Sequence, residues 1–149
     1  DQELFPPPKN ELYYDAESIC FYDNSLWIFT KCRTVPFDGK SKVYRINLNS
    51  SQRETVECEK VGEIIPGKKS WKTDSFTSCT VKNNTFFLLT YYRLIEVNTN
   101  DLSKTIKTKR FYHYIQREAI AISPSGLICV TNEGHWLLGK QKMKLYRNE

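Results

Sequence analysis

The 149-residue sequence predicts an all-β protein built from tandem four-stranded antiparallel units. Composition is the first observation, since Tyr, Phe and Trp make up 13% of the chain and there are only 6 Gly, as in a folded, strand-rich protein. Second, no segment shows the 3.6-residue apolar period of an amphipathic helix, so no helix is expected. Third, one stretch of strand, turn and strand recurs along the chain.

The recurrence is clearest between residues 15–31, DAESICFYDNSLWIFTK, and residues 116–134, QREAIAISPSGLICVTNEG. In this alignment Glu17 falls on Glu118, and the turn sequence DNS falls on PSG. A middle copy at 78–90, SCTVKNNTFFLLT, has NN at the same turn. Asn, Asp, Pro, Ser and Gly each favour tight turns for their own stereochemical reasons. The chain therefore contains three copies of one strand–turn–strand unit.

Outer strands complete these units. A third strand is expected after each copy, at 42–47, 93–98 and 144–148, and a fourth at 53–65 and 105–115. Residues 53–65 alternate apolar and charged side chains, as a half-exposed outer strand does. The inner segments AIAI and LICV are apolar at every position, so both faces of their sheet need cover. Radially packed blades of a β-propeller provide such cover, and a β-sandwich is the competing architecture.

We expect one domain with an N-terminal arm at 1–14 and blades at about 15–65, 73–115 and 116–149, the last incomplete. Propellers have four to eight blades, so three blades would leave two apolar faces uncovered. The chain is then a half-ring or a fragment. A homodimer could close the ring, with residues 4–14 supplying an outer strand to the partner. The remainder of a longer propeller, or an unusual three-unit monomer, are the alternatives.

The repeated acidic residue, Ala and apolar run, followed by a turn, strand and Thr, resembles secreted bacterial β-propeller-like proteins with E-A-I-A blade motifs. Distantly, it is similar to phytase- and esterase-like propellers. The resemblance implies an extracellular or periplasmic location and acidic residues that hold calcium in a central channel. The matching residues here are Glu17, Glu118 and Glu133, whereas the middle copy has Thr77. Alternatively, these Glu side chains serve only the contacts between repeats.

No catalytic motif is present, since the sequence lacks G-x-S-x-G, H-E-x-x-H, a P-loop and G-x-G-x-x-G. Neither His113 nor His135 has a nucleophile at a recognisable spacing. Aromatic residues in loop-like segments are better candidates, because exposed Trp and Tyr stack on sugars or contact partner proteins. The predicted ligand-binding residues are Trp71, Trp136, its neighbour His135, and Tyr92.

The net charge is +5, and basic residues cluster at 67–72, 105–110 and 139–144. A phosphate-binding groove would explain the clusters, and so would solvated strand edges, which often carry Lys. We prefer the second interpretation, so nucleic acid is not an expected partner. The five cysteines form no CxxC pair, so no structural metal is expected, and calcium is the only candidate cofactor. No apolar run reaches the roughly 20 residues of a membrane span.

The sequence thus predicts a non-catalytic propeller-type binding or assembly module. Its rim loops, around 33–41, 66–74 and 132–141, would contact a protein or a glycan. The alternative is a calcium-dependent hydrolase of the phosphatase or esterase-like kind, with the acidic residues in its central channel.

Overall fold

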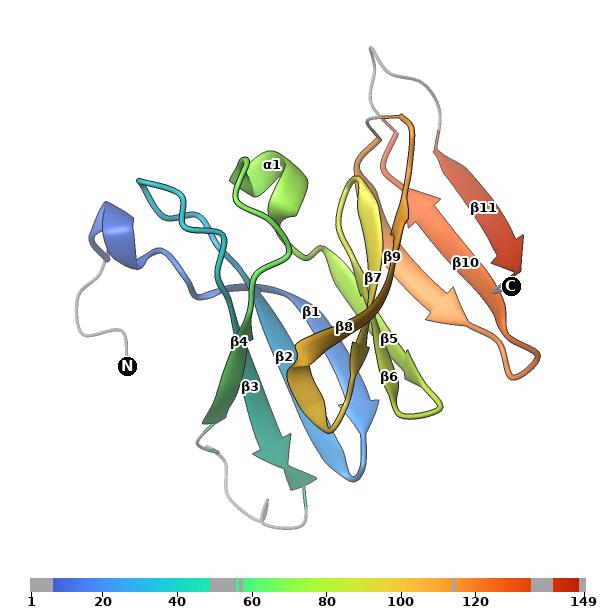
Figure 1. The fold of residues 1–149 in the computed structure, drawn as a ribbon, viewed down its shortest axis with the longest axis horizontal. Coiled ribbons are helices and arrows are strands. Elements are labelled where there is room, and N and C mark those ends of the chain that lie inside the picture. Colours follow the sequence, from blue (N-terminus) through green and yellow to red (C-terminus); the bar gives the residue numbers. More distant parts are fainter. Residues whose placement is uncertain (1–6, 49–55, 57, 114, 135–140, 148–149) are drawn as a thin grey trace.

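The computed structural model describes residues 7–48, 56, 58–113, 115–134 and 141–147. These residues form three antiparallel sheets of four, four and three strands, arranged one after another along the chain (Figure 1). The predicted fold class is confirmed: the protein is all-β and built of propeller-type blades.

The first sheet has the order β1-β2-β3-β4. Its strands are β1 (Asp15–Tyr22), β2 (Ser25–Lys31), β3 (Ser41–Asn47) and β4 (Glu59–Ile64). Asp23 and Asn24 connect β1 to β2 with φ values of 47° and 51°. Two consecutive left-handed residues define the hairpin turn whose twist matches that of the strands, and Asp and Asn adopt this conformation more readily than most residues.

The second sheet repeats this plan in the order β5-β6-β7-β8. Its strands are β5 (Ser78–Lys82), β6 (Thr85–Leu89), β7 (Arg93–Asn98) and β8 (Asp101–Arg110). The predicted turn at Asn83 and Asn84 has φ values of 48° and 55°, as in the first sheet. The third sheet has β9 (Arg117–Ile122), β10 (Leu127–Asn132) and β11 (Lys142–Arg147) in the order β11-β10-β9.

Two short helical segments were not predicted. The 3₁₀ segment η1 spans Lys9–Glu11, and α1 spans Trp71–Asp74 in the connection between the first two sheets. One turn of helix is too short to produce a periodic apolar pattern, which explains why neither segment was predicted. The turn of α1 is closed by the Asp74 N–H, which donates to the Ser70 carbonyl at 2.9 Å.

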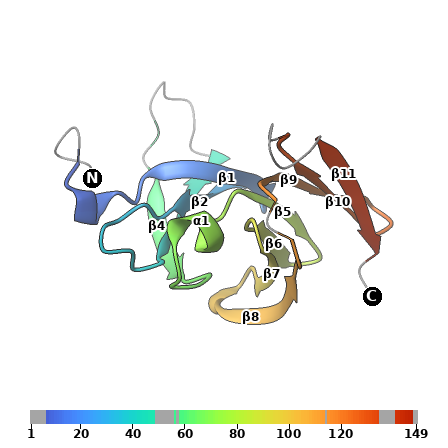
Figure 2. The same ribbon diagram turned by 90° about the horizontal axis from the view of Figure 1, so that it is seen from above.

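The first strands of neighbouring sheets lie side by side, β1 beside β5 and β5 beside β9, as the view from above also shows (Figure 2). The middle sheet is therefore covered on both faces. Phe86 and Leu88 pack with Trp27 and Phe29 of the first sheet. The alternate residues of the same strand, such as Phe87, pack with β9 and β10 of the third sheet. The four apolar residues of β6, at 86–89, thus bury alternately against the first and the third sheet.

The two outer sheets, unlike the middle one, each keep one open face. Ile120 is buried toward the middle sheet, but Ala119 and Ala121 are exposed on the opposite face. On β1 the outward-facing Ile19 and Phe21 are 56% and 57% exposed. An apolar run in the sequence shows that cover is needed, but not that this chain supplies it.

The described part of the N-terminal arm lies against its own chain. The Arg33 N–H donates to the Leu12 carbonyl and the Val35 N–H to the Lys9 carbonyl, each at 2.8 Å. The Tyr13 hydroxyl donates to Asp38 at 2.7 Å. These residues thus bind the connection between β2 and β3 of the same chain, and the pairing of the arm with a partner's blade stays a prediction.

Candidate functional site

The connections that join β2 to β3, β4 to β5, β6 to β7 and β8 to β9 lie at one end of the sheets, which we call the long-connection end because the β2–β3 and β4–β5 connections there are long (Figure 1). Two-residue turns close β1–β2 and β5–β6 at the other end, where the connection from β3 to β4 also lies. Connections carry binding residues more often than the strands that position them. Binding residues are therefore expected at this end.

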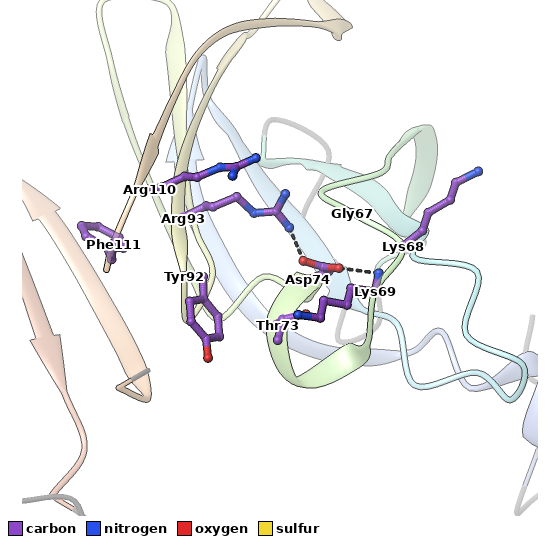
Figure 3. Close-up of a pocket in the computed structure, with 9 residues that line it drawn as sticks. All are labelled: Gly67, Lys68, Lys69, Thr73, Asp74, Tyr92, Arg93, Arg110 and Phe111. Atoms are coloured by element: carbon purple, nitrogen blue, oxygen red, sulfur yellow. Dashed lines mark hydrogen bonds and ion pairs between the residues drawn. The ribbon is translucent and has the colours of Figure 1, made fainter. Parts of the chain in front are cut away.

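A cavity of about 420 Å³ opens between three of these connections. It lies where the α1 segment meets the β6–β7 connection and the end of β8 (Figure 3). Its lining residues are Gly67, Lys68, Lys69, Thr73, Asp74, Tyr92, Arg93, Arg110 and Phe111. Two of the basic clusters of the sequence, 67–72 and 105–110, thus meet at one place.

Asp74 organises the wall of the cavity on the α1 side. Its side chain is only 8% exposed and forms an ion pair with Arg93. It also accepts a hydrogen bond from the backbone N–H of Lys69 at 2.6 Å. Figure 3 shows this carboxylate between the two donors. A buried carboxylate with two such donors fixes both the Arg93 side chain and the 67–74 connection.

Gly67 allows this arrangement because it has no side chain. A Cβ at this position would lie 2.5 Å from Arg93 Nη2 and 2.6 Å from Asp74 Cγ. Both distances are shorter than van der Waals contact, so any larger residue would displace the ion pair. The geometry of the cavity wall therefore depends on a glycine at this position.

Arg93 and Arg110 occupy directly opposite positions in the β7–β8 pair. Residues opposite each other have Cβ atoms about 5 Å apart, and like charges there destabilise a sheet. Both side chains extend from the sheet in the same direction (Figure 3). Asp74 compensates one of the two charges, and the second adds to the positive potential of the cavity.

Aromatic residues form the other wall. Tyr92 lines the cavity beside Phe111, and the Phe111 ring lies 4.1 Å from the guanidinium carbon of the buried Arg117. Arg117 donates to the carbonyl oxygens of Tyr91 and His113, which fixes the connection after β8. Burial lowers the pKa of Arg117. The aromatic wall is thus held by the third sheet as well as the second.

The four predicted ligand-binding residues have separate outcomes. Tyr92 lines the cavity. Trp71 lies in α1, and its ring stacks under the Arg33 guanidinium at 4.8 Å, outside the cavity lining. His135 and Trp136 lie outside the described residues. Their roles in binding stay predictions.

Glu17 on β1 and Glu133 just after β10 both lie within electrostatic reach of Glu118 at the start of β9. Burial raises the pKa of Glu118, and the charges of Glu17 and Glu133 raise it further. A hydrogen bond from Tyr91 and the charge of Lys31 oppose this rise.

Cations already occupy part of this region. The Lys31 side chain is 3% exposed, and its ammonium lies 2.5 Å from Glu17. Arg33 pairs with Asp15 and lies 3.5 Å from Glu17. Within the described part of the chain, no three His, Cys, Asp or Glu side chains form a group that could hold a metal ion. The calcium role of these carboxylates stays a prediction.

Sequence reasoning missed the principal residues of the cavity, namely Asp74, Arg93 and Arg110. The available signal was the position of two basic clusters, one in the β4–β5 connection and the other at the end of β8. In an antiparallel blade the end of the fourth strand and the connection that enters the blade's first strand lie at the same end. That topology could have suggested that the clusters converge.

No known protein family and no curated protein match this sequence significantly. Among solved structures, the chain is similar to a luciferin-regenerating enzyme, with a TM-score of 0.57 and 10% identity over 90% of this chain. It is also similar to the WD40 domain of Neurospora crassa Pan2, with a TM-score of 0.53 and 12% identity over 97% of this chain. It covers 45% and 42% of those chains, less than half of each. These similarities support the propeller-type fold. No helix in the described residues is long and apolar enough to cross a membrane.

Proposed function

We propose that this chain is a non-catalytic binding module that contacts an acidic segment of a partner protein at its long-connection end. The observation that carries the proposal is the cavity beside α1, which is lined by four basic residues and two aromatic residues. The net positive charge of the cavity lining favours an acidic protein segment over a neutral glycan. Arg and Tyr are also the residues that most often dominate binding at protein interfaces.

The fold itself does not choose between binding and catalysis. One structural neighbour is named as an enzyme and the other as a WD40 domain, and the same fold supports both. The choice therefore rests on the site. Its charged groups are four cations and one carboxylate already paired with Arg93, an arrangement suited to holding an anion.

Site-directed photo-cross-linking tests the proposal. A photoreactive residue is placed at Lys68, beside the cavity, or at Asn100, in the turn between β7 and β8 at the opposite end. We expect one partner protein to be cross-linked from position Lys68 and not from position Asn100. The additional substitution Tyr92→Ala should abolish the cross-link from position Lys68. Equal capture from both ends, or a partner unaffected by Tyr92→Ala, would show that this end is not the binding surface.

We further propose that three more blades complete the ring, from a second copy of this chain or from the remainder of a longer one. The open face of the first sheet supports this. Cross-strand register places Ile19, Ile28 and Tyr44 in one row, with Phe21 and Leu26 in the next. Both solved neighbours are about twice as long as the part that this chain covers.

Molar mass in solution tests the homodimer directly. A second copy gives a mass near twice 17.5 kDa, and Ile19→Asp should return it to one copy, because a charge cannot be buried unpaired in that contact. A folded chain with the mass of one copy at all concentrations excludes the homodimer.

The alternative function, a calcium-dependent hydrolase, is supported by one observation. Glu17 and Glu133 both lie within electrostatic reach of Glu118. Calcium would then raise the melting temperature and support phosphatase or esterase turnover, and Glu118→Gln would abolish both effects. Melting that is independent of calcium would refute this alternative.

A further inference from the structure

The cavity beside α1 has an excess of positive charge that its own carboxylate does not balance. Four basic residues line it, whereas Asp74 is the only carboxylate among the described lining residues, which leaves a net charge of +3. Asp74 is moreover committed to Arg93 and to the backbone of Lys69. The charges of Arg110 and Lys69 therefore act on whatever occupies the cavity.

The position of Arg110 indicates most about the kind of ligand that the cavity accepts. Opposite Arg93, Arg110 places a second like charge on the sheet, and Asp74 compensates only one of the two. A feature that costs stability in the free protein calls for a compensating role. A multiply charged anion placed between the two guanidinium groups would convert this repulsion into attraction.

We propose that this cavity binds a phosphoryl group carried on a side chain of the partner protein, an inference that rests on the proposed function. A phosphate monoester carries a charge of about −1.5 to −2 at neutral pH and offers three acceptor oxygens. Arginine binds such a group with two parallel hydrogen bonds, and two arginines held at adjacent positions can do so together. A carboxylate has one charge and two oxygens, so it satisfies fewer of these donors.

The size and second wall of the cavity suit a phosphorylated side chain. A volume of about 420 Å³ lies within the range of about 300–1,000 Å³ usual for small-ligand sites. Phe111 and Tyr92 provide an apolar surface for the carbon atoms that carry the phosphate. The cations line a single cavity, which suits a single phosphate.

A nucleic-acid strand would instead require cations in a continuous track along its backbone. The basic residues of β8 do not provide one on a single face. Lys109 lies 4.7 Å from the ring of Tyr146, toward the third sheet, whereas its neighbour Arg110 lines the cavity beside α1. Alternation along the strand divides the cluster between two sites.

The test uses degenerate peptides with one fixed phosphoserine, phosphothreonine or phosphotyrosine, measured by fluorescence anisotropy against the full chain. The same pools with the unphosphorylated residue, and with Glu at the fixed position, are the comparison. We expect at least one phosphorylated pool to bind about tenfold or more tightly than its counterparts, and inorganic phosphate to compete with it.

Arg110→Gln should weaken this binding by about tenfold to a hundredfold, because it removes charged hydrogen bonds to the phosphate. Its side chain is exposed, so the fold should be retained, which circular dichroism would verify. Lys104→Gln is the matched control, because it makes the same charge change on β8 outside the cavity lining. It should change the affinity by less than about twofold.

Each other outcome overturns the inference in a recognisable way. Equal binding of the Glu pool excludes phosphoryl selectivity but leaves an acidic partner segment, and so the proposed function, intact. An equal loss of peptide affinity in Arg110→Gln and Lys104→Gln shows that binding depends on the overall charge and not on this cavity. If no pool binds, the phosphoryl site is wrong, and the cross-linking experiment decides the proposed function independently.

Discussion

Phe86 and Phe87 provide the sharpest test of the blade arrangement, because adjacent residues of a strand point to opposite faces of the sheet. Phe86 is fully buried toward the first sheet, and Phe87 is 5% exposed toward the third. In a sheet with one covered face, only one of the two would be buried. The structure therefore predicts that Phe86→Ala and Phe87→Ala are both strongly destabilising.

The magnitude follows from burial. Truncating a buried Phe to Ala costs about 3–5 kcal/mol of unfolding free energy, through lost transfer energy and the cavity left behind. Phe86 also lies 5.0 Å from the ring of Trp27 and 5.2 Å from that of Phe29, in aromatic contacts worth about 0.5–1.5 kcal/mol each. We expect Phe86→Ala near the upper end of the range. A domain of ordinary stability, about 5–15 kcal/mol, would lose about a third or more.

Urea unfolding followed by circular dichroism measures both losses. With a slope of about 2 kcal/mol per molar urea, each variant should unfold at a midpoint about 2 M lower. Ile106→Ala, at a 51% exposed position of β8, is the control and should shift the midpoint by less than about 0.3 M. If either Phe87→Ala or Phe86→Ala behaved like this control, one face of the middle sheet would be open and the arrangement wrong.

Three further variants test the cavity wall and the buried carboxyl of Glu118. Gly67→Ala should destabilise the chain by about 1–3 kcal/mol in urea unfolding, because its Cβ would lie 2.5 Å from Arg93 Nη2; an unchanged midpoint would contradict this crowding. Asp74→Asn should cost about 1–3 kcal/mol by the same assay, since it leaves the largely buried Arg93 without its counter-charge. The same change at the exposed Asp101 should cost less, because Asn keeps a side-chain oxygen that can accept from Ser103. Glu118→Gln should raise the melting temperature at pH 7. Burial raises the pKa of Glu118 above 4.5, so the folded chain holds this proton more strongly than the unfolded chain. Stability then falls as pH rises from 4.5 through the folded pKa, and the advantage of Gln should vanish below pH 4.5. A constant advantage across pH 4–7 would refute that electrostatic origin.

The strand plan was predictable from the sequence because its signals are local. At Asn83 and Asn84 the turn residues are adjacent, and both adopt the positive φ that the hairpin requires. The apolar residues of β6 are likewise contiguous and indicate cover on both faces. The boundaries were less exact. The expected outer strand at 105–115 is β8 at Asp101–Arg110, because strand pairing with β7 and not composition fixes where it ends.

The cavity was not predictable, because it depends on relationships between distant segments. Arg93 stands opposite Arg110 only in one register, and a shift of one residue would turn Arg110 to the other face of the sheet. The sequence likewise gives no sign that Asp74 reaches Arg93, since this contact depends on a single helical turn and on a glycine that lets the connection approach. The same basic residues that look like solvated strand edges in the sequence converge in the fold. Since Lys109 and Arg110 face different sheets, it is the alternation of the strand that selects which cations form a site and which only cover a neighbouring ring.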